Sequence, residues 1–171
     1  MILGLSVAAF TTLHVVISLV GIATGIVVLL AMLANRHLGA WTAVFLATTV
    51  ATSVTGFFFP LKAVGPPHIV GAISLVVLAV ALYALYGAKL AGIWRVTYVV
   101  TAVAALYLNC FVGVVQAFLK LGPLHALAPA GTEPPFVAAQ GATLVLFVVL
   151  GWLAVRRYRP VLATVAGAAA A

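Results

Sequence analysis

Six side chains that can form hydrogen bonds interrupt the long apolar stretches of this chain, and they are its main candidates for chemistry. They are two histidines, two glutamines, one threonine and one asparagine: His14, Thr52, His68, Asn109, Gln116 and Gln140. A polar side chain within a membrane span costs free energy, and it normally faces other helices or a cavity. We predict that these six residues bind a small polar or anionic ligand.

The spacing of the polar residues predicts that several of them share helix faces. Residues three, four or seven positions apart lie on one side of a helix. This spacing relates two series of residues: Asn109, Gly113, Gln116 and Lys120, and Thr48, Thr52 and Thr55. At a rise of ~1.5 Å per residue, all six candidates fall in the outer half of their spans. Converging stripes would line a polar pocket that opens to the outside.

His14 shares a helix face with Ser18, Gly21 and Gly25. Two glycines four residues apart are typical of close helix–helix packing, so His14 is expected to face a neighbouring helix. Three roles remain open. The ring forms a hydrogen bond across the seam, to a threonine, Asn109 or a backbone carbonyl. Alternatively, it lines the pocket and contacts a ligand or passes a proton, since histidine titrates near pH ~6.5. The third role is to ligate haem.

Haem ligation is the disfavoured alternative for His14, and the cofactor, if any, stays unknown. Paired axial histidines must reach one iron, but His14 and His68 differ in depth by ~10 Å or more. His37 and His125 are expected in loops. The sequence has neither a carboxylate within a span nor the Cys and His spacing of a metal site.

No catalytic constellation is visible in the sequence. It lacks the G-x-S-x-G, H-E-x-x-H and P-loop motifs, and its only acid, Glu133, excludes paired carboxylates. The lone Cys110 cannot form an internal disulfide and is typical of small-residue packing. We expect no enzymatic activity, no catalytic residue and no metal site.

The composition is that of an integral membrane protein. Hydrophobic residues make up 67% of the 171 residues and charged residues 5%, whereas a soluble domain has about 45–50% and about 25%. The net charge of +7 does not indicate a nucleic-acid partner, because basic loop residues are what membrane topology requires. The expected partners are the lipid bilayer and either further copies of the chain or a membrane complex.

The hydropathy pattern predicts an all-α, polytopic bundle of five transmembrane helices. The apolar runs are continuous, without the alternation of barrel strands, so helices are expected. The spans lie at about 5–33, 41–59, 67–87, 94–119 and 136–155. The first span lacks the basic start of a signal peptide and is too long for one, so we expect it to be retained. Residues 1–160 form one domain, and 161–171 form a short Ala-rich cytoplasmic tail.

Loop charges predict the orientation of the bundle. The two sides receive Arg36, Lys89, Arg95, Arg156, Arg157 and Arg159, against Lys62, Lys120 and Glu133. The positive-inside rule then places the C-terminus in the cytoplasm and the N-terminus outside. Aromatic residues near the cytoplasmic ends form an expected interfacial belt: Trp41, Trp94, Trp152, Tyr83, Tyr86 and Tyr158.

The outer mouth of the predicted pocket is electropositive, which is why an anionic ligand is included. The third and fifth spans both begin after Pro-Pro, as first helical turns tolerate, and both direct positive dipole ends outward. Basic side chains lie nearby: Lys62, Lys120, His68 and His125. The alternative is that the lysines are solvated loop residues and Glu133 complements the start of the fifth span.

Two stretches carry a resemblance to a known family. They are "TTVATSVTGFFFP" (48–60) and "ALYLNCFVGVVQAFLKLGPLHALAPAGTEPPFVAAQG" (105–141). The chain resembles a family of uncharacterised small bacterial inner-membrane proteins over most of its second to fifth spans. The resemblance implies a multi-pass location in the bacterial plasma membrane, and it transfers no functional residues.

The leading functional hypothesis is a small membrane protein that binds or passes a small polar or anionic solute through an outer-half pocket. The first alternative is a non-catalytic structural or assembly subunit, in which the same residues only bond helices together. The second is a haem- or quinone-linked redox protein.

Overall fold

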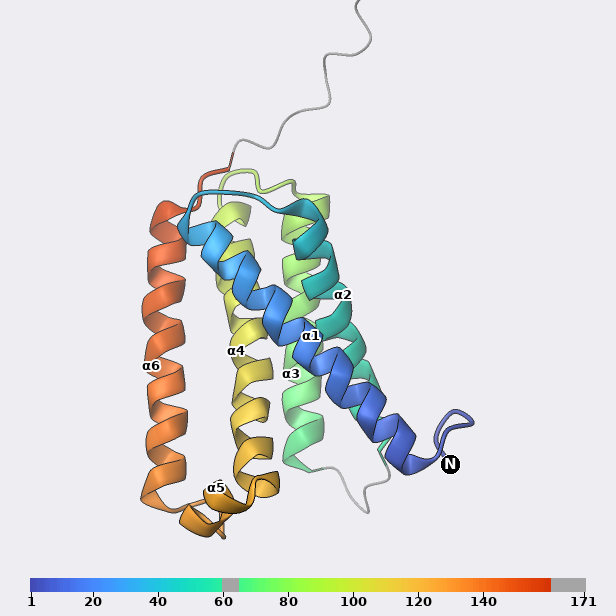
Figure 1. Cartoon of the computed structure of the whole chain (residues 1–171). Helices are drawn as coiled ribbons and strands as arrows, with labels where there is room; N and C mark the ends of the chain where they lie inside the picture. The colour runs from blue at the N-terminus through green and yellow to red at the C-terminus, as the bar shows by residue number, and fades with distance from the viewer. Residues whose placement is uncertain (60–64, 161–171) are drawn as a thin grey trace, which may run out of the picture.

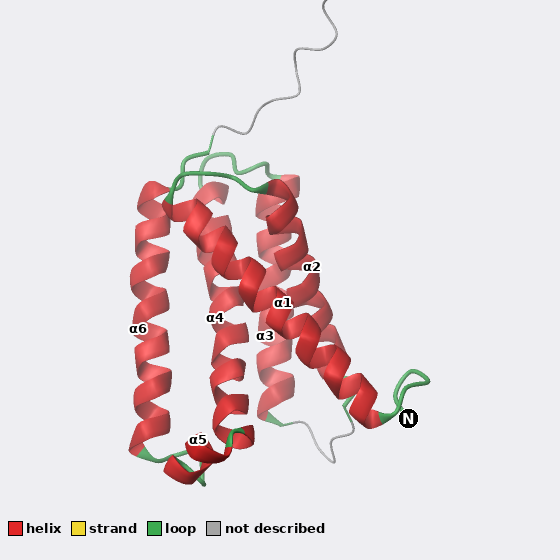
Figure 2. Cartoon of the chain, in the orientation of Figure 1, coloured by secondary structure: helices red, strands yellow, loops and turns green. Residues whose placement is uncertain are grey.

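The computed structural model describes residues 1–59 and 65–160, and in this part of the chain it is all-helical apart from an isolated bridge between Ile2 and Leu5 (Figure 2). The elements are α1 (Val7–Leu33), α2 (Gly39–Gly56), α3 (Pro66–Leu82), the π-helix η1 (Tyr83–Gly87), α4 (Trp94–Lys120), α5 (Gly122–Leu127) and α6 (Pro134–Arg157). Lys62 and the predicted tail 161–171 lie outside the described residues.

Four helical segments are long and apolar enough to cross a membrane: Val7–Leu33, Pro66–Gly87, Trp94–Lys120 and Pro134–Arg157. Their length and composition are those of a multi-pass membrane protein. The second expected span is α2, which is not among the four. It has 18 residues, including six Ser or Thr that lower its hydropathy. The fifth crossing therefore stays a prediction.

The long helices run up and down in one bundle, with α4 at its centre (Figure 1). α4 contacts α1, α2, α3 and α6, whereas α1 crosses the bundle obliquely and packs mainly along α2. The core contains aromatic and aliphatic side chains from several helices, among them Phe45, Leu78, Tyr98 and Leu106. Helix α4 is thus the element against which the others are positioned.

Helix α6 lies at the side of the bundle (Figure 1), and only its Phe147 and Ala154 are buried. Much of its remaining surface consists of large exposed apolar side chains, including Val145, Val148 and Val149. Such a surface is suited to lipid or to another apolar helix.

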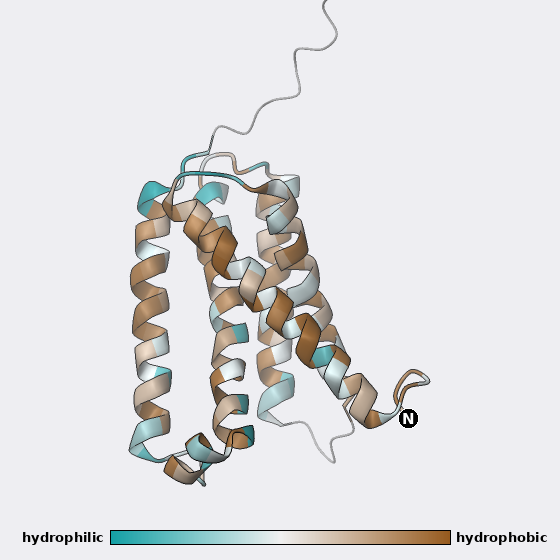
Figure 3. Ribbon diagram, in the orientation of Figure 1, coloured by the Kyte–Doolittle hydropathy of each residue, from teal (hydrophilic) through white to brown (hydrophobic). Residues whose placement is uncertain are grey.

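The two ends of the bundle differ in character. The α1–α2 connection, the segment before α4 and the end of α6 lie together at one end (Figure 1), where hydrophilic colours also gather (Figure 3). These segments carry Arg36, Lys89, Arg95, Arg156, Arg157 and Arg159, and we call this end the arginine end. The beginning of α1 and the short helix α5 lie at the opposite end.

The structure differs from the predicted boundaries at two places. The second span was expected to reach residue 59, but α2 ends at Gly56 and the chain turns through Phe57 and Phe58. The segment after Lys120 was expected to be a loop, but Pro123 stands in the first turn of α5, where proline is tolerated. The prediction that His125 lies in a loop is therefore wrong, because α5 contains it.

Candidate functional site

His14 faces α2 and contacts it through a hydrogen bond. Its Nδ1 lies 2.7 Å from Thr55 Oγ1, and its ring meets Phe59 edge to face with centroids 5.2 Å apart. The Thr55 hydroxyl also donates to Ala51 O at 2.7 Å. Because a hydroxyl has one hydrogen, this donation makes His14 Nδ1 the donor and leaves Nε2 as an acceptor. Of the three predicted partners of His14, a threonine, Asn109 or a backbone carbonyl, the structure shows a threonine, Thr55.

The two glycines on the His14 face allow close packing, as their spacing predicted. A Cβ on Gly25 would lie 2.6 Å from Leu106 Cδ1 and 2.8 Å from Phe45 Cε2. A Cβ on Gly21 would instead meet polar atoms, 3.1 Å from Asn109 Nδ2 and 3.3 Å from the hydroxyls of Thr48 and Thr49. Gly21 therefore lies against a polar cluster, and Gly25 lies against an apolar one.

Asn109 is the most deeply placed of the six candidates. It is 8% exposed, and its Nδ2 has no hydrogen-bond partner among the described residues. The nearby hydroxyls of Thr48 and Thr49 donate to Val44 O and Phe45 O of their own helix, both at 2.7 Å. Their oxygens still have lone pairs with which to accept. An unpaired buried donor is costly in a bilayer, so Asn109 Nδ2 is a candidate to donate to water or to a ligand.

Thr52 lies between these two groups along α2. It is three residues from both Thr49 and Thr55, which places all of them on neighbouring turns over ~9 Å. Its Oγ1 is buried and, within the described part of the chain, has no hydrogen-bond partner. We call the surface that α1, α2 and α4 share here the polar seam, comprising His14, Gly21, Thr48, Thr49, Thr52, Thr55 and Asn109.

An apolar layer closes the polar seam on the side of the arginine end. Phe45 and Leu106 are each 1% exposed, and both press against the bare backbone of Gly25. Gly25 is one helical turn closer to the arginine end than Gly21, so this layer lies between the Asn109 cluster and the arginine end. Toward the arginine end, the polar seam is therefore bounded by tightly packed apolar side chains.

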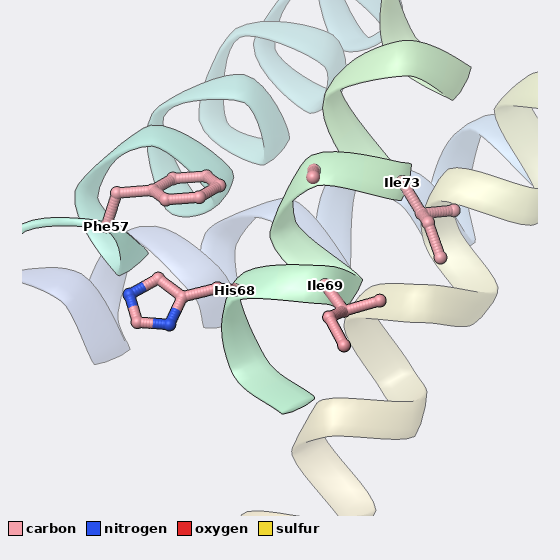
Figure 4. A pocket seen from close by; sticks show the side chains of 5 residues that line it. Phe57, His68, Ile69 and Ile73 are labelled. Atoms are coloured by element: carbon pink, nitrogen blue, oxygen red, sulfur yellow. The ribbon is translucent and has the colours of Figure 1, made fainter. Parts of the chain in front are cut away.

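His68 lies away from the polar seam, at the beginning of α3 (Figure 4). Its Nδ1 accepts from Gly65 N at 3.3 Å, and its ring is 5.6 Å from that of Phe57. With Phe57, Ile69, Ala72 and Ile73 it borders a hollow of about 410 Å³ whose lining is almost wholly apolar. The geometry makes His68 a helix-capping residue beside an apolar surface.

The two glutamines also lie outside the polar seam. Gln140 on α6 donates from Nε2 to Phe111 O on α4 at 3.2 Å, while its buried Oε1 has no partner within residues 1–59 and 65–160. Gln116 is exposed on α4. The predicted stripe from Asn109 to Lys120 therefore passes from the interior to the surface as α4 approaches α5.

A second polar cluster, which the sequence did not predict, lies at the arginine end. Tyr158 was expected in the interfacial belt, but it is 1% exposed and its hydroxyl lies 2.8 Å from His37 Nδ1. Arg95 Nη1 donates to the carbonyls of Val155 and Tyr158, at 2.9 Å and 2.7 Å. These bonds connect the beginning of α4 to the end of α6, where Tyr158 is buried.

Burial changes the acid–base properties of this arginine-end cluster. It raises the pKa of the Tyr158 hydroxyl and lowers the pKa of His37, because both charged forms lose hydration. The two residues are 121 positions apart, and nothing local in the sequence indicates their pairing.

Glu133 serves its own loop at the opposite end. Its carboxylate accepts from Ala130 N at 2.8 Å and from Thr132 N at 2.9 Å. The bond from Ala130 in particular lowers the pKa of the carboxyl group. The only acid of the chain therefore closes a turn before α6.

Comparison with protein-family models, with curated proteins and with solved structures gives no match for this chain.

Proposed function

We propose that this chain is a multi-pass membrane protein that binds and passes a small polar solute through the polar seam. The observation that carries the proposal is the unpaired amide of Asn109, buried beside two threonine hydroxyls and the bare backbone of Gly21. Thr52 adds a second unpaired group on the way to His14. Three of the six sequence candidates thus support one site, namely His14, Thr52 and Asn109.

The groups of the polar seam favour a neutral polar solute over an anion. Asn109 Nδ2 donates, the threonine oxygens accept, and His14 Nε2 accepts in the tautomer described above. None of the seven seam residues is a lysine or arginine, and a buried anion without a compensating charge is costly. Water, urea or a small polyol fits this chemistry, and Phe45 with Leu106 would act as the gate.

The proposed topology completes this assignment. Helix α2 forms a fifth crossing, which puts the two termini on opposite sides of the membrane, the N-terminus outside and the C-terminus in the cytoplasm. The arginine end then faces the cytoplasm, as the positive-inside rule requires. We place the protein in the bacterial plasma membrane as a homo-oligomer or a subunit of a complex, without enzymatic activity.

The test is solute flux into proteoliposomes, followed by light scattering after mixing with urea or glycerol. Asn109→Leu and Thr52→Val should abolish protein-dependent flux, because they remove the polar groups of the seam. Gln116→Leu is the matched control on α4, since Gln116 is exposed. Equal flux through Asn109→Leu and the unmodified protein, with both variants folded, would refute the proposal.

An assembly subunit is the second candidate, favoured by a specific observation. Polar bonds join helices at His14–Thr55 and Gln140–Phe111, and α6 keeps a broad apolar face. Co-purification of a stable membrane partner, together with flux that Asn109→Leu leaves unchanged, would favour this function. A Soret band in the purified protein would instead select the haem-linked alternative.

A further inference from the structure

We propose that the groove between α4 and α6 is a binding site for an anionic glycerophospholipid. One acyl chain lies in the groove, and the phosphate of the headgroup is held by arginines at the arginine end. This site is separate from the polar seam and does not depend on the proposed function.

The groove runs along two helices, α4 and α6. Its volume is about 430 Å³ and its lining is almost entirely apolar. One stripe from each helix forms its walls: Val96, Val100, Val103, Ala104 and Tyr107 on α4, and Leu144, Phe147, Val148, Gly151, Trp152 and Val155 on α6. Residues at these spacings lie on one face of each helix, so the two faces oppose each other along the groove.

The length of the groove fits one chain of a single leaflet. Leu144 and Val155 are eleven positions apart, which corresponds to ~17 Å along α6. Half of the ~30 Å hydrocarbon layer is of similar length. An acyl chain can therefore fill the groove while its headgroup lies level with the end of α6.

The charge at the mouth of the groove selects an anionic headgroup. Arg156 and Arg157 end α6 and are exposed, and Arg156 lies over Trp152 beside the groove. Arg95, at the beginning of α4, adds positive charge at the same end, while its Nη1 donates to the carbonyls of Val155 and Tyr158. The only acid in the sequence, Glu133, precedes α6 at the opposite end, so no carboxylate neutralises these arginines. Basic pockets between membrane helices are suited to anionic lipid headgroups.

Trp152 connects the charged mouth with the apolar groove. It lines the groove, and the guanidinium carbon of Arg156 lies 3.9 Å from the centre of its ring. The ring thus holds Arg156 at the mouth by a cation–π contact. An arginine fixed in this way loses less conformational freedom when it binds a phosphate.

The experiment is native mass spectrometry of the full chain in mild detergent, with phosphatidylglycerol or phosphatidylcholine of identical acyl chains. Phosphatidylglycerol should be retained in preference. The double variant Arg156→Gln/Arg157→Gln should lose about fivefold of this preference per arginine, since each basic residue contributes about 1 kcal/mol. Equal retention of both lipids by the unmodified protein would overturn the proposal.

A second variant tests the groove itself. A Cβ on Gly151 already lies 3.3 Å from Val103 Cγ1, so Gly151→Leu fills the groove and should abolish retention of phosphatidylglycerol. Gly141→Leu is the control on the same helix, because a Cβ there has no neighbour within 4 Å among the described residues. If Gly151→Leu instead converts a lipid-free dimer into a monomer, a second copy occupies the groove and the proposal is wrong.

Discussion

The side-chain amide of Asn109 meets the bare backbone of Gly21, so closely that a Cβ on Gly21 would lie 3.1 Å from Nδ2. The contact joins α4 to α1 within the bundle. In the described part of the chain, Asn109 Nδ2 has no hydrogen-bond partner. A glycine is needed here because a Cβ would lie within 3.1–3.3 Å of polar side-chain atoms of Asn109, Thr48 and Thr49.

Gly21→Ala should therefore reduce solute flux through the polar seam and lower stability by about 1–3 kcal/mol, the usual cost of overpacking. The measurements are proteoliposome flux and thermal unfolding in detergent. Gly113→Ala is the control, because its Cβ would lie 3.6 Å from Ile22 Cδ1, an ordinary contact. A Gly21→Ala protein with full flux would show that the solute does not use this cluster.

Gly25→Ala should destabilise the protein more than Gly21→Ala does. Its Cβ would lie 2.6 Å from Leu106 and 2.8 Å from Phe45, both buried and unable to retreat easily. The order of melting temperatures among the alanine variants at Gly113, Gly21 and Gly25 checks this expectation. A melting temperature for Gly25→Ala equal to that of the Gly113 control would contradict the tight apolar layer.

The bond between His14 and Thr55 should appear as coupling in a double-mutant cycle. Thr55→Val leaves the half-buried His14 Nδ1 without its partner, at an expected cost of about 0.5–1.5 kcal/mol. His14→Leu combined with Thr55→Val should then cost less than the sum of the single variants, by about 0.5–3 kcal/mol. Strictly additive unfolding free energies would argue against the bond.

Acidification should destabilise the arginine end through His37. Burial lowers its pKa, so the unfolded chain binds a proton more readily, and stability falls as the pH decreases below about 6.5. The decrease should stop below the lowered pKa of the folded state. Tyr158, whose hydroxyl lies 2.8 Å away, stays neutral in this range because its pKa is raised.

His37→Gln is the variant that isolates this effect from the other three histidines. Melting temperatures measured between pH 7.5 and pH 5 should fall less for His37→Gln than for the unmodified protein. The charged groups that face His37 at this end are Arg36, Arg95 and Arg159. Identical pH profiles for the two proteins would assign the acid sensitivity elsewhere.

The topology prediction is checked by tag accessibility in intact cells. A C-terminal tag should be protected from an external reagent, and an N-terminal tag should react with it, because the basic loops lie with the C-terminus. Reaction of both tags would place the two termini on the same side and contradict the five-crossing topology.

The sequence determined the helical character and the approximate limits of the long helices. Hydropathy is a local property, and twenty apolar residues in a bilayer must satisfy their own backbone hydrogen bonds. Local spacing also predicted that His14, Gly21 and Gly25 face another helix, which the contacts of the two glycines confirm. The four segments that meet the length and hydropathy required of a span were all expected.

Only the tertiary structure decided which of the polar residues meet. His14 and Thr55 are 41 positions apart, and spacing within one helix cannot indicate which threonine of another helix it contacts. For the same reason, the sequence predicted Gln116 in a pocket, but it is exposed, and Tyr158 in an interfacial belt, but it is buried. A helix face is fixed by local geometry, but its partner depends on how helices distant in sequence pack against each other.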